Sequence, residues 1–292
     1  MYCTKHLKST SKVYDFDSEF GKKGIETNAA SDRGRMSNFE KLNSENVREE
    51  SGQGILVLPI GSVEQHGPHL PLTVDIEIPV RIATMVVQKI RGFVAPAICY
   101  GARSLPQSGG SPDIPGTIRI RGSVLTEYLK DVITGYVSMG FRFILILNGH
   151  YENESFLFEA LELCRQEGRL EGARIVALSW WSLVPQALLD KLFGDRFTGW
   201  HAEHASACET SLMLYLRKDL VGGARVDNPT PPRAGIYTFP IEAAKISNRG
   251  VLGSTSFSSA EMGEALFEEI CAQLVAVIHE QMGPESGGKS KP

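Results

Sequence analysis

The sequence predicts a single-domain α/β protein whose largely parallel β-sheet is flanked by helices. Three observations support this prediction. Short apolar runs alternate with longer segments of helical periodicity, the apolar runs are unbroken as in strands buried on both faces, and neither a linker nor an internal repeat interrupts residues 54–282. Alternation of strands and helices favours parallel strands, because each helix carries the chain back across the sheet.

The first half of the domain begins with GILVLPI (Gly54–Ile60), an apolar run of the length of a buried strand. Helical spacing of apolar residues predicts a helix over Ile78–Ile90, and FVAPAI (Phe93–Ile98) predicts a second strand. A longer helix is expected over Ser123–Met139, with its first serine as N-cap and Gly140 just past its end.

The second half begins with the clearest strand of the chain, FRFILIL (Phe141–Leu147), followed by a helix over Glu152–Glu167. ARIVALSW (Ala173–Trp180) predicts a fourth strand. Two further helices are expected at Ala205–Leu216 and at Ser259–Gln281, the latter opening with Ser-Ala-Glu capping chemistry. In open α/β sheets, ligands bind beyond the carboxyl ends of the strands, so functional side chains are expected in those loops.

Composition narrows the class of protein. Hydrophobic residues at 42% and charged residues at 22% are ordinary globular values, which exclude wholesale disorder and a collagen-like repeat. Thirty Lys and Arg against 34 Asp and Glu give a net charge of -4, which argues against a nucleic-acid-binding protein. No apolar run approaches the ~18 residues of a transmembrane helix, so no membrane partner is expected.

The cysteines and the termini indicate a cytoplasmic protein. Five cysteines, an odd number with no CxxC pair, occur in a chain too large to need disulfides, and we interpret them as reduced thiols. Residues 1–36 are polar and lack the apolar core of a signal peptide, which predicts a disordered extension before a domain at residues 37–282. The composition of residues 283–292 predicts a disordered tail.

Two doublets of histidine and glutamate follow two separate strands. Glu64 and His66 come after the first strand, followed by Asp75, and His150 and Glu152 come after the third. In an extended backbone, residues spaced i, i+2 point to the same side. Mixed His and carboxylate donors suit Zn or Mn rather than a soft thiolate site. In a dinuclear centre with ions ~3.5–4 Å apart, Asp75 is the natural bridging carboxylate.

A simpler explanation exists for each residue taken alone, since a single His in a strand-end loop is usually a surface or capping residue. The two doublets together, each after a buried strand, favour a metal site more strongly than one doublet alone would. His69 is interpreted as a structural residue or one that supports the metal ligands without binding metal itself, because Pro68 and Pro71 restrict its backbone.

A third cluster lies in GWHAEHASACETSLML, where Trp200, Glu203, His204 and Glu209 surround a predicted helix start. Glu203 and His204 suit an acid–base pair, with the alternative that these charges face water and the helix dipole. The Gly/Pro-rich segment Gln107–Thr117 is a loop that lacks the arrangement of a phosphate-binding P-loop.

Together, the segments VLPIGSVEQHGPHLPLTVD, SGG with PGT, LNGHYEN and GWHAEHASACETSLML resemble the signature of the creatininase (creatinine amidohydrolase) family. The resemblance runs in order from about Gly54 to about Met282. It implies a compact α/β fold, two divalent metal ions (Zn and/or Mn), and a homo-hexamer built as a trimer of dimers.

The resemblance also implies roles for individual residues. Glu64, Asp75 and His150 would hold one ion, and His66, Asp75 and Glu152 the other, with Asp75 bridging. Residues that would line the substrate pocket or take part in catalysis are Ser108, Tyr151, Trp181, Trp200, Glu203 and His204.

One position departs from the family pattern. Creatininases proper carry an Asp directly after the tryptophan matched by Trp200, and this chain carries His201 in that substrate-contacting position. Because a histidine differs from a carboxylate in charge and reach, the exact substrate stays open. Retention of Trp200 and Tyr151 favours creatinine, because an aromatic wall suits a flat, delocalised ring.

The expected activity is reversible, metal-dependent opening of the cyclic amide of creatinine to give creatine. Metal-bound hydroxide would attack the carbonyl, Glu152 would orient the water, and His204, steered by Glu203, would protonate the leaving nitrogen. The alternative is a hydrolase of the same fold acting on another amide, such as a formamide, lactam or peptide-like bond, which the His201 departure favours. A non-catalytic metal-binding protein is the third possibility, and it is the weakest because every ligand position is filled.

Overall fold

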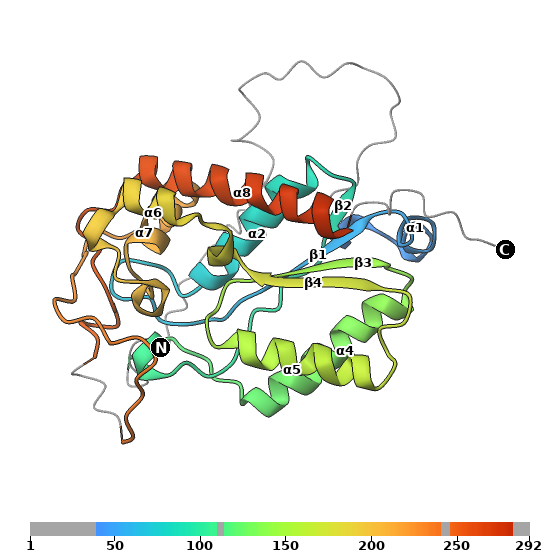
Figure 1. The fold of residues 1–292 in the computed structure, drawn as a ribbon, viewed down its shortest axis with the longest axis horizontal. Coiled ribbons are helices and arrows are strands. Elements are labelled where there is room, and N and C mark those ends of the chain that lie inside the picture. The colour runs from blue at the N-terminus through green and yellow to red at the C-terminus, as the bar shows by residue number, and fades with distance from the viewer. Residues whose placement is uncertain (1–38, 110–113, 241–245, 283–292) are drawn as a thin grey trace, which may run out of the picture. The chain divides into compact units, whose positions relative to one another are not determined.

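Four parallel strands form the sheet in a computed structural model of the chain, which describes residues 39–109, 114–240 and 246–282 (Figure 1). The strands lie in the order β2 (Gly92–Val94), β1 (Ile55–Ile60), β3 (Phe143–Asn148) and β4 (Arg174–Ser179). Their pairing is in register, with Ile60 opposite Asn148 and Asn148 opposite Ser179. The loops that follow β1, β3 and β4 therefore leave the sheet at the same edge.

Helices cover both faces of the sheet (Figure 1). One face is covered by α4 (Gly122–Ser138) and α5 (Asn153–Gln166), and the other by α2 (Val74–Val87), α7 (Ala207–Leu216) and α8 (Ala260–Met282). The remaining helical elements of the described residues are short: η1 (Phe39–Lys41), α1 (Ser44–Glu50), α3 (Pro106–Gly109), η2 (Trp180–Leu183), α6 (Gln186–Leu192), η3 (Gly194–Arg196), η4 (Trp200–Ala202) and η5 (Lys218–Leu220).

The alternation of side chains along the central strands divides the core into two layers. Val57 of β1 packs with the α2, α7 and α8 layer, whereas its neighbours Leu56 and Leu58 pack with the α4 and α5 layer. All three side chains are fully buried. Because successive strand residues point to opposite faces, an unbroken apolar run is what a strand covered on both sides requires. The predicted single-domain α/β fold with a parallel sheet is confirmed.

Several local expectations differ from the structure, among them the predicted loop Gln107–Thr117, whose first residues lie in the short helix α3. The second strand is shorter than predicted, because Pro96 has no N–H to donate and the regular ladder ends at Val94. The first long helix begins at Val74 rather than Ile78, so Asp75 lies in a helical turn and not in a loop. Ser123 is not an N-cap: α4 begins at Gly122, and the side chain of the N-cap residue Arg121 makes no capping hydrogen bond.

Two expectations about helix ends are met within the described residues. Gly140 follows the end of α4 with φ +102°, and Ser259 Oγ accepts a hydrogen bond from Met262 N at 3.3 Å near the start of α8. The four described cysteines are unpaired, and none of the described helices is both long and apolar enough to cross a membrane. The described residues form one compact unit, and the predicted extension at residues 1–36 and tail at residues 283–292 lie outside them.

Candidate active site

Two glycines allow the loops after β1 and β3 to meet the first turn of α2. A Cβ on Gly61 would approach the backbone oxygen of Asp75 to 2.2 Å, and a Cβ on Gly149 would approach the same atom to 2.2 Å. Only a residue without a side chain fits at such a distance from backbone. The close approach brings Glu64 and His150 to the carboxylate of Asp75 at the carboxyl edge of the sheet.

A first group of possible metal ligands contains Glu64, Asp75 and His150, all buried. His150 Nδ1 lies 3.0 Å from Glu64 Oε2 and 2.9 Å from Asp75 Oδ2. These residues are the three that the sequence resemblance assigns to one ion.

A second group shares Asp75 with the first and adds His66 and Glu209. His66 Nε2 lies 3.1 Å from Asp75 Oδ1 and 3.7 Å from Glu209 Oε2. Asp75 thus turns one oxygen toward each group, which is the arrangement of a carboxylate that bridges two ions.

Glu209 occupies the place in the second group where the resemblance assigned Glu152. It lies in the first turn of α7, and its Oε2 accepts a hydrogen bond from Ala205 N at 2.6 Å. Glu152 lies beside the groups instead, with its Oε2 3.4 Å from His150 Nε2, and its assignment as a ligand stays a prediction. Glu209 was noticed in the sequence only as part of a helix start, since nothing in local spacing links it to His66.

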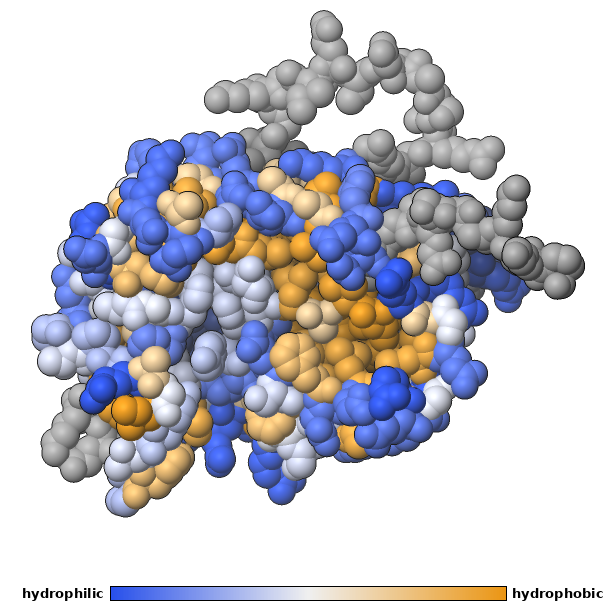
Figure 2. Space-filling view, viewed as in Figure 1, coloured by the Kyte–Doolittle hydropathy of each residue, from blue (hydrophilic) through white to orange (hydrophobic). Residues whose placement is uncertain are grey.

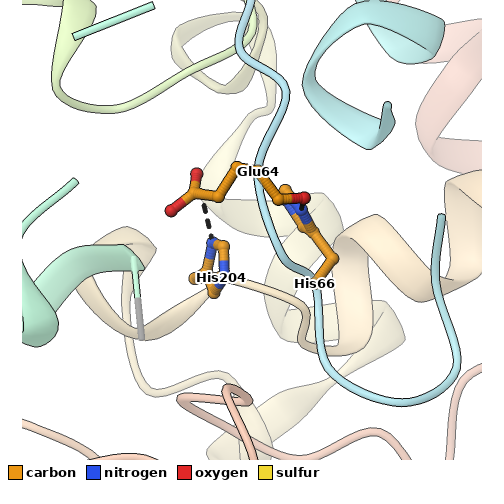
Figure 3. A group of neighbouring side chains, drawn as sticks. All are labelled: Glu64, His66 and His204. Atoms are coloured by element: carbon orange, nitrogen blue, oxygen red, sulfur yellow. Dashed lines mark hydrogen bonds and ion pairs between the residues drawn. The ribbon is translucent and has the colours of Figure 1, made fainter. Parts of the chain in front are cut away.

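His204 reaches the cluster from the segment before α7 (Figure 3). Its Nδ1 lies 3.9 Å from Glu64 Oε2, and its ring lies 4.3 Å from that of His66, centroid to centroid. Figure 3 shows the Glu64 carboxylate turned toward His204, while His66 lies beside the Glu64 backbone, where its Nδ1 is 3.1 Å from the carbonyl oxygen.

Gln65 holds the other side of the His204 ring, a contact that sequence reasoning missed. Gln65 Nε2 lies 2.9 Å from His204 Nε2, and it also donates to the carbonyl oxygens of Gly109 at 3.0 Å and Gly250 at 3.1 Å. With Nε2 covered in this way, Nδ1 is the His204 nitrogen that faces the cluster.

Burial and charge shift the pKa values of the cluster in opposite directions. Burial raises the pKa of Glu64 to about 7, and the neighbouring His150 opposes that rise. Burial alone would also raise the pKa of Asp75, but the close charges of His66 and His150 hold it well below its usual range. For His66, burial lowers the pKa, and the carboxylates of Asp75 and Glu209 outweigh burial and raise it.

The expected acid–base pair of Glu203 and His204 is not joined by a hydrogen bond among the described residues. Glu203 Oε2 instead accepts from Cys208 N at 2.9 Å, and burial raises the pKa of Glu203 to about 8. Burial, followed by the charge of His66, holds the pKa of His204 well below its usual range. His204 is therefore neutral near pH 7 in this environment.

The chemistry of the cluster suits divalent cations. Four buried polar atoms make no well-formed hydrogen bond although other polar groups surround them: Glu64 Oε1, His66 Nε2, Asp75 Oδ2 and Glu152 Oε2. Buried carboxylates without hydrogen bonds are costly unless a cation compensates them. Nitrogen and oxygen donors in this mixture are the ligands of Zn²⁺ and Mn²⁺.

A small pocket of ≈ 30 Å³ adjoins the cluster and has an aromatic wall. Tyr151 stacks on Trp181 at 6.1 Å, and Trp180 packs edge-on against Trp181 and Trp200, each at 5.6 Å. Ser108, also in the wall, donates a short hydrogen bond to Glu152 Oε1. Trp180 is a pocket residue that the sequence analysis did not single out.

His201 is turned away from this pocket. Its Nε2 lies 3.0 Å from the carbonyl oxygen of Pro232, and it is not among the residues that line the pocket. The other residues assigned to the pocket by resemblance, Ser108, Tyr151, Trp181, Trp200, Glu203 and His204, all line it. A direct contact of His201 with substrate stays a prediction.

Comparisons with known proteins show which family this chain resembles. The family model described as "Creatininase: Creatinine amidohydrolase" matches residues 40–278. The chain is 37% identical over 244 residues to the creatinine amidohydrolase of Pseudomonas putida, a match that covers 82% of this chain and 94% of that protein. It is 32% identical over 225 residues to the mycofactocin precursor peptide peptidase of Mycolicibacterium smegmatis, covering 74% of this chain and 81% of that one.

Solved structures are similar in the same region. A crystal structure of creatinine amidohydrolase (creatininase) superposes with a TM-score of 0.81 at 33% identity, covering 85% of this chain and 99% of that chain. Two similar structures, each with a TM-score of 0.80, are described as a Zn-Zn type and as an Mn form of creatininase.

Proposed function

The chain belongs to the creatininase family, and we propose that it hydrolyses the cyclic amide of creatinine to give creatine, in a reversible, metal-dependent reaction. The observation that supports this proposal most directly is the pair of His–carboxylate groups that share Asp75 beside an aromatic-walled pocket. Similarity to the Pseudomonas putida creatinine amidohydrolase favours creatinine as the substrate.

The two groups fit two divalent ions, Zn²⁺ or Mn²⁺. Glu64, Asp75 and His150 would hold one, and His66, Asp75 and Glu209 the other. When bound, such ions supply Lewis acidity and lower the pKa of a coordinated water toward ~7. Similarity to creatininase structures described as Zn-Zn and Mn forms supports both metals as candidates.

The protein's own groups position the substrate and move protons. The Ser108 hydroxyl fixes Glu152 Oε1, which leaves the buried Oε2 free to orient a water molecule. Because Gln65 covers His204 Nε2, any proton that His204 carries to the leaving nitrogen must travel through Nδ1. Tyr151, Trp181 and Trp200 form an aromatic wall beside the reacting amide and exclude bulk water.

A second candidate function is hydrolysis of a different amide. His201 stands where creatininases proper have an Asp, and its ring is engaged by the Pro232 carbonyl rather than by the pocket. Similarity to a mycofactocin precursor peptide peptidase supports a peptide-like substrate as this alternative, and a formamide or another lactam is a further alternative.

Mass-spectrometric conversion of creatinine to creatine tests the proposal. Purified protein loaded with Zn²⁺ or Mn²⁺ is compared with the same protein in excess chelator. Chelator-sensitive conversion supports creatinine as the substrate. Bound metal without conversion would contradict the creatinine assignment and move the search to formamides and other lactams.

A further inference from the structure

The pocket beside the cluster is too small for most of a substrate. At ≈ 30 Å³ it has room for about two water molecules, since one water needs ~10–15 Å³ of such space. Ligand sites commonly measure ~300–1,000 Å³. The inner pocket therefore accommodates the reacting group, and the rest of a larger substrate must lie elsewhere.

A second cavity of ≈ 420 Å³ adjoins the first, and we call it the outer chamber. The two cavities share three lining residues, Ser108, Tyr151 and Glu152. A group that extends from the reacting amide past the Ser108–Glu152 hydrogen bond thus enters the outer chamber. In Figure 2 the surface is hollowed over the loops that follow the strands.

The walls of the outer chamber combine aromatic rings with three charged side chains, one arginine and two glutamates. Tyr151, Phe156 and Tyr237 supply rings, the last from a segment far along the chain. Arg103 is the one cation among the described lining residues, its side chain is exposed, and it forms no ion pair with a described residue. The two carboxylates of the wall are engaged: Glu152 accepts from Ser108, and Glu154 accepts from Ser179 Oγ at 2.5 Å.

We propose that the outer chamber binds the part of the substrate beyond the scissile amide, and that this part is a planar group with a carboxylate. The ring would stack between the tyrosines, and the Arg103 guanidinium would pair with the acid, as guanidinium groups do with carboxylates. This inference rests on the proposed amide hydrolysis and extends it to a substrate class, amides with an acidic aromatic tail. Hydrolysis of such a formamide adds water across the C–N bond and releases formate and an aromatic amine.

Two matched probes test the chamber: 4-formamidobenzoate and its neutral isostere 4-formamidobenzamide. Their dissociation constants are measured by calorimetry on the full-length, metal-loaded protein, and product formation is followed in the same samples so that the heat of any hydrolysis is subtracted. We expect the acid to bind at least about tenfold more tightly than the amide, as one charge-assisted hydrogen-bonded pair provides. Equal affinities would overturn the proposal.

Four substitutions test which residues cause the preference for the acid probe. Arg103→Gln should abolish the preference for the acid, and Arg103→Lys should keep part of it. Arg174→Gln, at the opposite end of the sheet on β4, should leave it unchanged. Tyr237→Ala should weaken both probes several-fold, because it removes a stacking face from each. A preference that survives Arg103→Gln would place the acid elsewhere, for example on the metal ions, and would overturn the proposal.

The same samples separate this inference from the proposed function. If the protein shows the Arg103-dependent preference but hydrolyses neither creatinine nor either probe, the proposed hydrolase activity is contradicted. The proposed role of the outer chamber in binding the acid is then supported. If the protein converts creatinine but shows no preference for the acid, the proposed hydrolase activity is supported. The proposed role of the outer chamber is then contradicted.

Discussion

At the scale of single residues, Asp75 organises the site because its two oxygens serve two groups. Oδ2 lies 2.9 Å from His150 Nδ1, and Oδ1 lies 3.1 Å from His66 Nε2. The two histidines in contact with Asp75 stabilise its charged form against burial, and the charged form is the one that binds metal.

Glu152→Gln should abolish most turnover without unfolding the protein. The amide keeps the size of the side chain, but Glu152 Oε2, buried beside His150 Nε2, loses the charge needed to orient water. We expect kcat to fall by roughly 10²- to 10⁴-fold, the usual contribution of a positioned acid–base group. Steady-state assays and thermal melting check this, with exposed Glu159→Gln as control. A near-normal rate would remove Glu152 from the chemistry.

Glu209→Gln should weaken the second metal group while leaving the first. The substitution removes the carboxylate 3.7 Å from His66 Nε2, and Glu209 lies outside the group of Glu64, Asp75 and His150. We expect one of two metal-binding steps to weaken at least about tenfold in competition with a chromophoric chelator. Exposed Glu268→Gln serves as control. If both binding steps stay as tight as in the wild type, Glu209 is not a ligand.

At the scale of elements, the sequence predicted the framework better than the site. Unbroken apolar runs identified β1 and β3, because a strand covered on both faces admits few polar residues. The loops after those strands carry Glu64, His66 and His150. They are expected at one edge of the sheet because the strands are parallel. The helical position of Asp75 was missed, since α2 begins with Val-Asp and carries no side-chain cap to mark its start.

Contacts between distant elements could not be predicted in this way. Glu209 on α7 and Gln65 after β1 reach the site only because α7 packs near α2 and the strand ends. The spacing of residues along the sequence does not reveal which distant elements pack against each other. The resemblance to a family supplied the pocket residues, and it did so without indicating that His201 turns to Pro232.

The junction of α4 and β3 depends on a glycine. Gly140 has φ +102°, and a Cβ there would meet Ser51 Oγ at 2.8 Å. Gly140→Ala should lower the free energy of unfolding by about 1–2 kcal/mol, because an L side chain is disfavoured in the left-handed region. Gly135, inside α4 with open space around it, is the matched control, and its change to Ala should stabilise by about 0.5–1 kcal/mol. Urea denaturation measures both, and a stabilising Gly140→Ala would contradict this account.

At the scale of the whole molecule, the sheet has an apolar outer edge. No strand of the described residues pairs with the far side of β4, and its residues 175–178 are hydrophobic and only partly buried. Figure 2 shows an apolar patch on this face, in the region where β4 lies between α8 and α5 in Figure 1. An exposed strand edge with an apolar surface is a template for association.

A groove of ≈ 530 Å³ continues this apolar surface, with Phe158, Leu161 and Ile175 in its walls. Phe158 is 48% exposed and lies within this contiguous apolar surface, which is the kind of patch that marks an association site. We propose that copies of this chain associate through this patch, in keeping with the homo-hexamer that the family resemblance implies. Each Å² of apolar surface buried between subunits would contribute ~25 cal/mol of favourable free energy to association.

Phe158→Lys should therefore shift the protein to a smaller assembly. A charge in the centre of a contact must be desolvated without a partner, whereas on a free surface it would be harmless. Light scattering coupled to size-exclusion chromatography measures the mass, and circular dichroism checks that the fold is kept. Tyr128→Lys is the control, because Tyr128 is 50% exposed on α4 and lies outside the groove. An unchanged assembly in a folded Phe158→Lys protein would place the subunit contacts on another face.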